Sequence, residues 1–239
     1  MSRKSRPHPA KPSVATAQPV QPAARRGLFI AAIVGLLIAF VLATLLYKSE
    51  QSSSATAGAV KNSAALASVH SPSSGNPAAK VHLVEFLDPA CGTCAAFFPQ
   101  VKALMAAHPG RVRLSLRHVP FHRGSDLVVR ILEASREQGQ YMSTLEGLYA
   151  SQPRWVIQHV VQADAVWQAV GGLGLDLDKL RRDMDSPEVA RRMAQDMTDA
   201  QSLGVSKTPE FFVNGRPLPS FGLDELNALV REEVLAAYR

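Results

Sequence analysis

The sequence predicts an α/β domain, a small mixed sheet with a helical block inserted in its middle, preceded by one transmembrane helix. Three observations support this prediction. A strand–helix–strand pattern covers residues 81–117, and a helical pattern follows over about 122–203. A hairpin and a last helix cover residues 210–238. Upstream, the 19 residues from Leu28 to Leu46 carry no charge, which is typical of a membrane-spanning helix.

The positive net charge of the chain comes from its first 26 residues. The formal net charge is +6, from 26 Lys and Arg against 20 Asp and Glu. Six of the basic residues and no acidic residue lie in residues 1–26, so the remaining residues hold 20 of each sign. A basic face for nucleic acid is therefore not expected. The 46% hydrophobic composition excludes a chain that is disordered throughout.

Residues 27–47 are predicted to anchor the chain in a lipid bilayer. Arg25 and Arg26 directly precede the apolar run, and few charges follow it. The positive-inside rule therefore predicts a cytoplasmic tail over residues 1–26 and a C-terminal part outside the cytoplasm. The location expected is the inner membrane of a bacterium, with the domain in the periplasm. The alternative is a signal peptide cleaved near Ala55-Thr56-Ala57, but the apolar segments of signal peptides are shorter, about 7–15 residues.

Residues 48–79 are predicted to form a flexible linker. They contain nine serines among scattered Ala, Gly and Pro, without an apolar period. The folded domain is then expected over residues 80–239, which is long enough to bury one core.

The first half of the domain predicts a βαβ unit. Residues 81–87 are mostly apolar, as in a buried strand, and end at Asp88-Pro89. A helix is expected from Cys91 to His108, where Pro109-Gly110 stops it. Residues 111–117 alternate between polar and apolar and predict a second strand, parallel to the first.

The second half predicts helices followed by a hairpin. The helices are expected over residues 125–138, 140–150, 156–170, 176–185 and 187–203. Asn214-Gly215 between two apolar segments, 210–213 and 216–218, is a strong hairpin signal. A last amphipathic helix covers residues 223–238.

The chain has two cysteines, Cys91 and Cys94, at the turn from the first predicted strand into the first helix. Cys91 lies at or near the helix N-cap, where unpaired N–H groups favour a thiolate, the nucleophile of disulfide exchange. Cys94 lies three residues on, close enough for a disulfide within one helical turn. Attack by Cys91 on a disulfide of another protein would form a mixed disulfide, which Cys94 would then resolve.

Other uses of the two thiols are open on the residues alone. A purely structural disulfide is disfavoured, because so short a loop removes little entropy from the unfolded chain. A second chain could complete a zinc site. A tethered Cu(I) carrier is the main alternative function, since soft thiolates select Cu(I) and His118 and His122 follow. The strand-to-helix position favours redox chemistry without a metal or an organic cofactor.

The sequence around the cysteines resembles the active-site segment of the thioredoxin superfamily. Glu85 stands six residues before Cys91, where that superfamily commonly has a buried acid that relays protons to the second cysteine. Pro99 stands where thioredoxins have the proline that kinks the helix. Thr208-Pro209, ahead of the predicted hairpin, matches the cis-proline loop. The helical block resembles the insertion of the DsbA-like branch.

This resemblance implies a thioredoxin-like fold with an inserted helical domain. It also implies a thiol-disulfide oxidoreductase that acts on cysteine-containing proteins outside the cytoplasm and is recycled by a membrane redox partner. Its site residues would be Cys91 and Cys94 as the redox pair, with Glu85, Thr208 and Pro209. One departure concerns the dipeptide between the cysteines, which is Gly92-Thr93 where DsbA members usually have Pro-His. One source of thiolate stabilisation is therefore missing.

Overall fold

The structure of the chain is a computed structural model that describes residues 33–46, 64–67 and 69–239. The predicted tail, residues 1–26, and residues 48–63 of the predicted linker lie outside the described residues. The chain divides into two units, residues 1–52 and 53–239. In the first unit, residues 33–46 form an α-helix with exposed side chains. Within the described ranges, no helix has both the length and the apolar character that a membrane crossing requires. The predicted span, 27–47, extends beyond the described helix at both ends.

The second unit is built on a five-stranded mixed sheet with the order β1-β3-β2-β6-β7. Only β2 and β3 are parallel, as the βαβ pattern predicts, and the other neighbours are antiparallel. The elements of this part are β1 (Ser73–Gly75), β2 (Val81–Leu87), α2 (Gly92–Ala107), β3 (Val112–His118), β6 (Glu210–Val213), β7 (Arg216–Pro217) and α8 (Leu223–Ala237).

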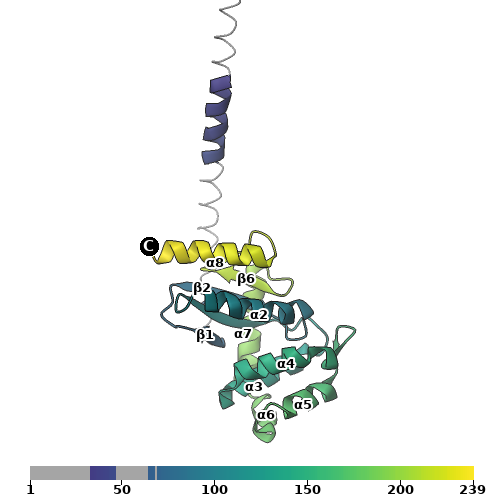
Figure 1. Cartoon of the computed structure of the whole chain (residues 1–239). Helices are drawn as coiled ribbons and strands as arrows, with labels where there is room; N and C mark the ends of the chain where they lie inside the picture. Colours follow the sequence, from purple (N-terminus) through teal and green to yellow (C-terminus); the bar gives the residue numbers. More distant parts are fainter. Residues whose placement is uncertain (1–32, 47–63, 68) are drawn as a thin grey trace, which may run out of the picture. The chain divides into compact units, whose positions relative to one another are not determined.

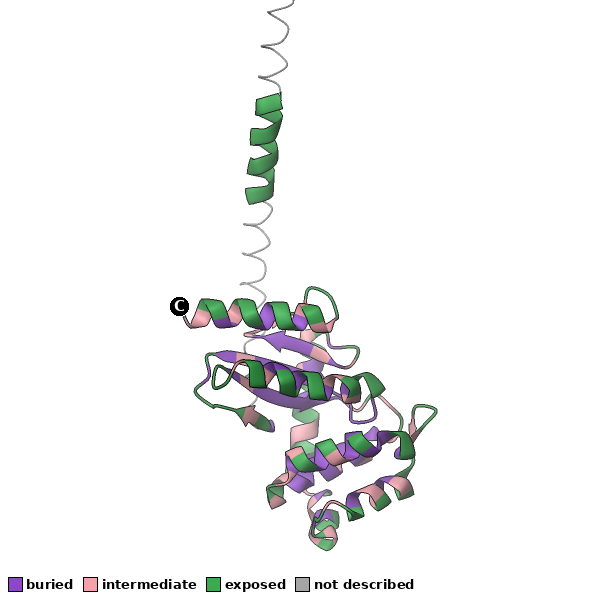
Figure 2. Ribbon diagram, viewed as in Figure 1, coloured by how far each residue is buried: buried purple, intermediate pink, exposed green. Residues whose placement is uncertain are grey.

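Helices cover both faces of the sheet (Figure 1). One face carries Leu83 and Leu114, which belong to the same buried cluster as residues of α2 and α8. The other face carries Val84 and Phe86, which pack with Ala200 of α7 (Pro187–Leu203). The alternation of side chains along β2 therefore serves two separate cores, and Figure 2 shows the central strands buried between them.

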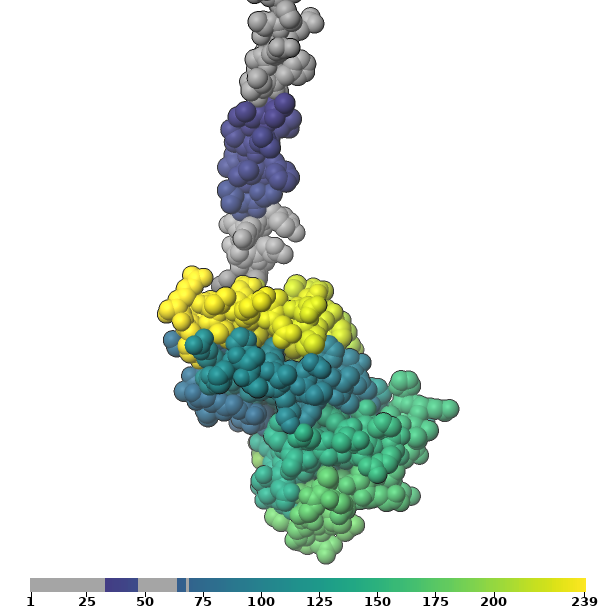
Figure 3. Space-filling view, viewed as in Figure 1, coloured from purple at the N-terminus to yellow at the C-terminus, as the bar shows by residue number. Residues whose placement is uncertain are grey.

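The helical insertion forms one end of the unit, coloured green in Figure 3. Its elements are α3 (Ser125–Ser135), a 3-10 turn η1 (Arg136–Gln138), α4 (Tyr141–Trp155), β4 (Val156–Ile157), β5 (Val160–Val161), α5 (Ala163–Gly171), α6 (Leu177–Asp183) and α7.

One predicted helix of the insertion, over residues 156–170, is wrong in its first part. Residues 156–161 form the β4–β5 hairpin, and the helix begins only at Ala163. The turn is made by Gln158 and His159, with φ of 49° and 62°. Left-handed backbone at two residues that are not glycine is a tertiary feature, which helical periodicity does not reveal.

The predicted flexible linker, 48–79, is wrong for its described part, because the folded unit begins before Lys80. Residues of β1 pair with β3 on the outer edge of the sheet. Leu66 is 4% exposed and belongs to the cluster on the α7 face. The fully buried Arg117 donates to the carbonyl oxygen of Ala65 at 2.8 Å and pairs with Asp196 of α7. Backbone pairing, the apolar contact of Leu66 and the hydrogen bond from Arg117 order this Ser-rich segment.

Candidate active site

Cys91 is the N-cap of α2 and lies directly after the turn that leaves β2. Its backbone is extended, with φ −75° and ψ 118°, and its Sγ accepts a hydrogen bond from the backbone N–H of Cys94 at 3.4 Å. Both cysteines are free thiols. A sulfur in this position faces the unpaired N–H groups of the first helical turn, which stabilise a negative charge there.

The surroundings of Cys91 lower its pKa to about 5. The largest contribution is the hydrogen bond from the side chain of Cys94. Partial burial opposes the shift, while hydrogen bonds from Thr208 and from the backbone of Cys94 and Thr93 add to it. At neutral pH Cys91 is therefore a thiolate, although no histidine lies between the cysteines.

Cys94 behaves in the opposite way, because burial raises the pKa of its thiol. Cys94 is 0% exposed, and its hydrogen bond to Cys91 and the charge of Glu85 raise the pKa of its thiol further. The two cysteines of one helical turn therefore differ in protonation state. Cys91 is ready to attack, and Cys94 holds its proton.

Glu85 lies on β2, on the same side of the strand as Leu83 and Leu87, and is 2% exposed. Burial raises the pKa of its carboxyl group to about 8, and the charge of Cys91 adds to this shift. The structure therefore places the predicted buried acid close enough to both cysteines to interact electrostatically with them.

The peptide bond between Thr208 and Pro209 is cis, as predicted. The loop reaches the cysteines because β6, which follows it, is paired with β2, with Glu210 opposite Phe86. The Sγ of Cys91 lies 3.4 Å from the carbonyl oxygen of Thr208. The sheet thus brings together residues that are 117 positions apart in the sequence.

Asp88 is a site residue for which sequence analysis gave no role beyond ending the strand. It is 0% exposed, and its Oδ1 accepts from the backbone N–H of Ala90 at 2.8 Å. Its Oδ2 accepts from the backbone and the Nδ1 of His122, both at 2.7 Å. Asp88 therefore ties the turn before Cys91 to the first loop of the insertion. Its position directly after an apolar strand was a usable signal.

Gln152 of α4 is a second contact that sequence analysis missed. It is 8% exposed, and its Nε2 donates to the carbonyl oxygens of Pro89 at 2.8 Å and of Cys91 at 3.1 Å. No local pattern marks this residue, because it is 61 positions from Cys91 and lies in a helix of mixed composition.

The two histidines considered for Cu(I) have other partners. His118 Nε2 lies 2.8 Å from the Tyr141 hydroxyl, and its Nδ1 lies 3.2 Å from Glu133. His122 is bound to Asp88. Among the described residues, no group of three or more His, Cys, Asp or Glu side chains is placed to hold a metal ion.

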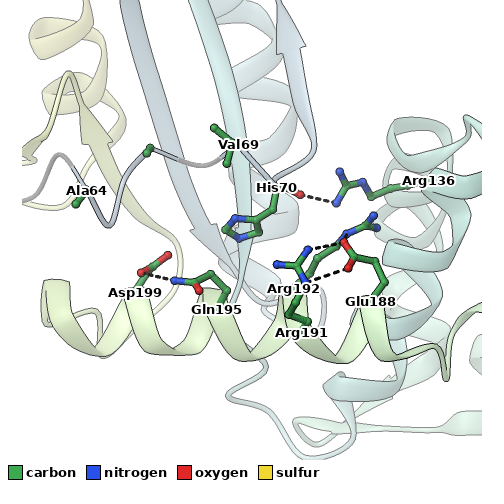
Figure 4. Close-up of a pocket in the computed structure, with 10 residues that line it drawn as sticks. Ala64, Val69, His70, Arg136, Glu188, Arg191, Arg192, Gln195 and Asp199 are labelled. Carbon is green, nitrogen blue, oxygen red and sulfur yellow. Dashed lines mark hydrogen bonds and ion pairs between the residues drawn. The ribbon is translucent and has the colours of Figure 1, made fainter.

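A separate cavity of about 570 Å³ lies between α7 and the segment that precedes β1 (Figure 4). Arg136, Arg191 and Arg192 line it together with Glu188. These arginines are already paired, Arg136 with Glu133 and the other two with Glu188. Neither cysteine lines this cavity, and its charges are largely balanced.

Comparisons with known proteins agree with this geometry. The thioredoxin family matches residues 67–232, a range that begins before β1, as the fold does. A thioredoxin-like oxidoreductase from Silicibacter pomeroyi has a solved structure that is 32% identical, with a TM-score of 0.62, covering 73% of this chain and 96% of its own.

Two curated relatives differ in how much of them the chain covers. A probable disulfide bond formation protein D from Bacillus anthracis is 26% identical over 171 residues, covering 67% of this chain and 76% of that protein. The Na(+)/H(+) antiporter NhaA of Herminiimonas arsenicoxydans is 31% identical over 140 residues, or 59% of this chain. The chain spans only 22% of that antiporter's length. The family match extends over more than half of the residues of this chain. The chain therefore belongs to the thioredoxin family, as its resemblance to the DsbA-like branch predicts.

Proposed function

We propose that the protein is a thiol-disulfide oxidoreductase that exchanges disulfides with cysteine-containing proteins outside the cytoplasm. The observation that carries this proposal is the unequal state of the two cysteines. Cys91 has a pKa of about 5 at the start of α2, and Cys94 is a buried thiol next to it. Such a pair suits attack followed by resolution.

In the reducing direction, the Cys91 thiolate attacks one sulfur of a substrate disulfide. A bond forms between Cys91 and that sulfur, the substrate S–S bond breaks, and the second substrate sulfur leaves with the electron pair and takes up a proton. Cys94 then loses its proton and attacks the Cys91 sulfur. The bond between Cys91 and the substrate sulfur breaks, and that sulfur leaves with the electron pair and takes up a proton. The substrate is then a dithiol, and Cys91 and Cys94 are joined as a disulfide. The same steps in reverse oxidise a substrate dithiol.

Glu85 is the acceptor that we propose for the Cys94 proton. Cys94 lies in a desolvated position where its thiolate is disfavoured, so resolution needs a base nearby. A carboxyl group with a pKa of about 8 is partly ionised at neutral pH and can accept this proton.

The Thr208-Pro209 loop is the proposed contact for the substrate backbone. Proline has no backbone N–H to donate. The backbone groups that could bond to a substrate strand are therefore those of the residues next to Pro209. The Thr208 carbonyl lies beside Sγ of Cys91, where a substrate strand could add alongside it. Phe221 is 46% exposed and packs against Phe97 of α2 at 5.0 Å between ring centroids. It offers apolar contact to an unfolded chain.

The trapping experiment tests the proposed function. Cys94→Ser leaves the Cys91 nucleophile but removes the resolving thiol, so mixed disulfides between the protein and its substrates should accumulate on non-reducing gels. Cys91→Ser is the matched control and should trap none, because Cys94 is buried and protonated. Absence of adducts with Cys94→Ser, together with tight Cu(I) binding by the wild type, would favour the copper carrier instead.

We also propose that residues 27–47 anchor the protein in the inner membrane, with the domain in the periplasm. The described part, 33–46, is a helix of apolar, exposed residues, and the basic residues lie upstream. The full chain should sediment with membranes and resist extraction by salt or carbonate, and a protease added to spheroplasts should digest the domain. A soluble chain that begins near Gly58 would instead establish cleavage.

The buried carboxyl of Glu85 predicts a pH dependence of stability. The pKa of Glu85 is about 8 in the folded protein and about 4.5 in the unfolded chain. The stabilisation of the folded state by proton binding to Glu85 is therefore complete below pH 4.5 and is lost as the pH rises to 8. Glu85→Gln should therefore raise the free energy of unfolding at pH 7 by on the order of 3 kcal/mol. It should not do so at pH 4. Urea unfolding of the reduced protein across this range measures the difference.

Glu146→Gln is the control for this measurement, because Glu146 is exposed on α4 and pairs with Lys102 on the surface. An equal effect of Glu85→Gln at pH 4 and pH 7 would show that Glu85 is not a buried acid with a raised pKa.

A further inference from the structure

The turn before Cys91 is held by hydrogen bonds from two sides. Asp88 accepts from the Ala90 N–H within the turn, and the Cys91 N–H donates to the Asp88 carbonyl at 3.0 Å. From the other side, the Gln152 amide spans the carbonyls of Pro89 and Cys91. The Cys91 carbonyl also accepts the N–H of Ala95, at 3.1 Å, as the first bond of α2. One buried side chain therefore reaches both ends of the segment that carries the nucleophile.

Helix α4 holds Gln152 firmly in this position. Tyr149, one turn earlier on the same side of the helix, packs against Phe98 of α2 at 5.4 Å between ring centroids. Trp155 is 0% exposed, and its Nε1 donates to the carbonyl of Leu148 at 3.0 Å. Gln152 lies on this anchored helix and is itself buried, so its amide is preorganised for the two carbonyls.

We propose that Gln152 is a positioning residue of the redox site, which fixes the carbonyls of Pro89 and Cys91 so that the Cys91 sulfur stays over the N-terminus of α2. This inference rests on the proposed function and assigns a role in it to the inserted helical segment. Two physical effects support the role. The amide hydrogens offset the negative ends of two carbonyl dipoles near the thiolate. They also hold the backbone in the extended geometry that aims Sγ at the Cys94 N–H.

Among the described residues, three titratable groups on three different elements interact with Cys91. They are Cys94 on α2, Glu85 on β2 and Tyr149 on α4, and Thr208 adds a hydrogen bond from the cis-proline loop. Asp88 and His122 pair with each other at the turn. Replacing Gln152 by an uncharged residue leaves all of these groups in the chain. A change in the titration of Cys91 would therefore report the loss of the amide contacts.

The test is Gln152→Met, which keeps the length of the side chain and removes the donor. Alkylation of Cys91 by iodoacetamide, resolved by mass spectrometry at a series of pH values, gives the pH midpoint of its reactivity. We expect the midpoint to move up by about 0.5–1 pKa unit, which from a wild-type value of about 5 lowers the thiolate fraction at pH 5 by about 2–5-fold. Gln138→Met is the matched control. Gln138 also makes two hydrogen bonds to backbone groups in the insertion, but both are to Asp176 and not to the redox turn. Its midpoint should stay at the wild-type value.

An unchanged midpoint in a folded Gln152→Met protein would overturn the proposal, since a merely structural glutamine would lower thermal stability without moving the titration. If that variant does not fold, Gln152→Leu replaces it, because leucine also removes the donor without adding a charge near Cys91. The midpoint of Gln152→Leu should lie above the wild-type value, and that of Gln138→Leu should not. The readout needs no substrate. A wild type with reactive Cys91 but no disulfide exchange would refute the proposed function while leaving this inference testable.

Discussion

The Cys91 sulfur can carry a negative charge chiefly because the first turn of α2 points hydrogen-bond donors at it. Two sulfurs three residues apart share one helix end, and they cannot share it equally. Cys91, as the N-cap, receives the Cys94 N–H and the Cys94 thiol. Cys94 supplies those donors from inside the core and keeps its own proton. The proposed attack by Cys91 and resolution by Cys94 both depend on this difference in protonation state, which the rest of the fold must maintain.

Strand β2 and two segments that are distant in sequence surround the two cysteines. The central position of β2 brings the buried acid Glu85 beneath the helix end, and its pairing with β6 brings the cis-proline loop against the sulfur. The insertion adds the third part through Gln152 and through the loop bound to Asp88. The helical block is therefore in direct contact with the redox turn. The hydrogen bonds that hold this turn come from the insertion as well as from the thioredoxin-like core.

The sequence was sufficient where local chemistry decides the structure. The parallel βαβ unit, the hairpin at Asn214-Gly215 and the placement of both cysteines follow from apolar periodicity and turn residues. It was insufficient where distant partners decide. Strand β1 has no apolar pattern and forms because the edge of β3 is available. The left-handed turn at Gln158 is likewise invisible to periodicity. Gln152 resembles any helical glutamine until its two carbonyl partners are known.

The most direct test of this account is a titration of the reduced protein by the ultraviolet absorbance of its thiolates. We expect one thiolate per molecule to form with a midpoint near pH 5, and this thiolate to disappear in Cys91→Ser. The second cysteine should stay protonated throughout the range in which the protein is folded. Two thiols that titrate together near the free-cysteine value of about 8.5 would contradict it.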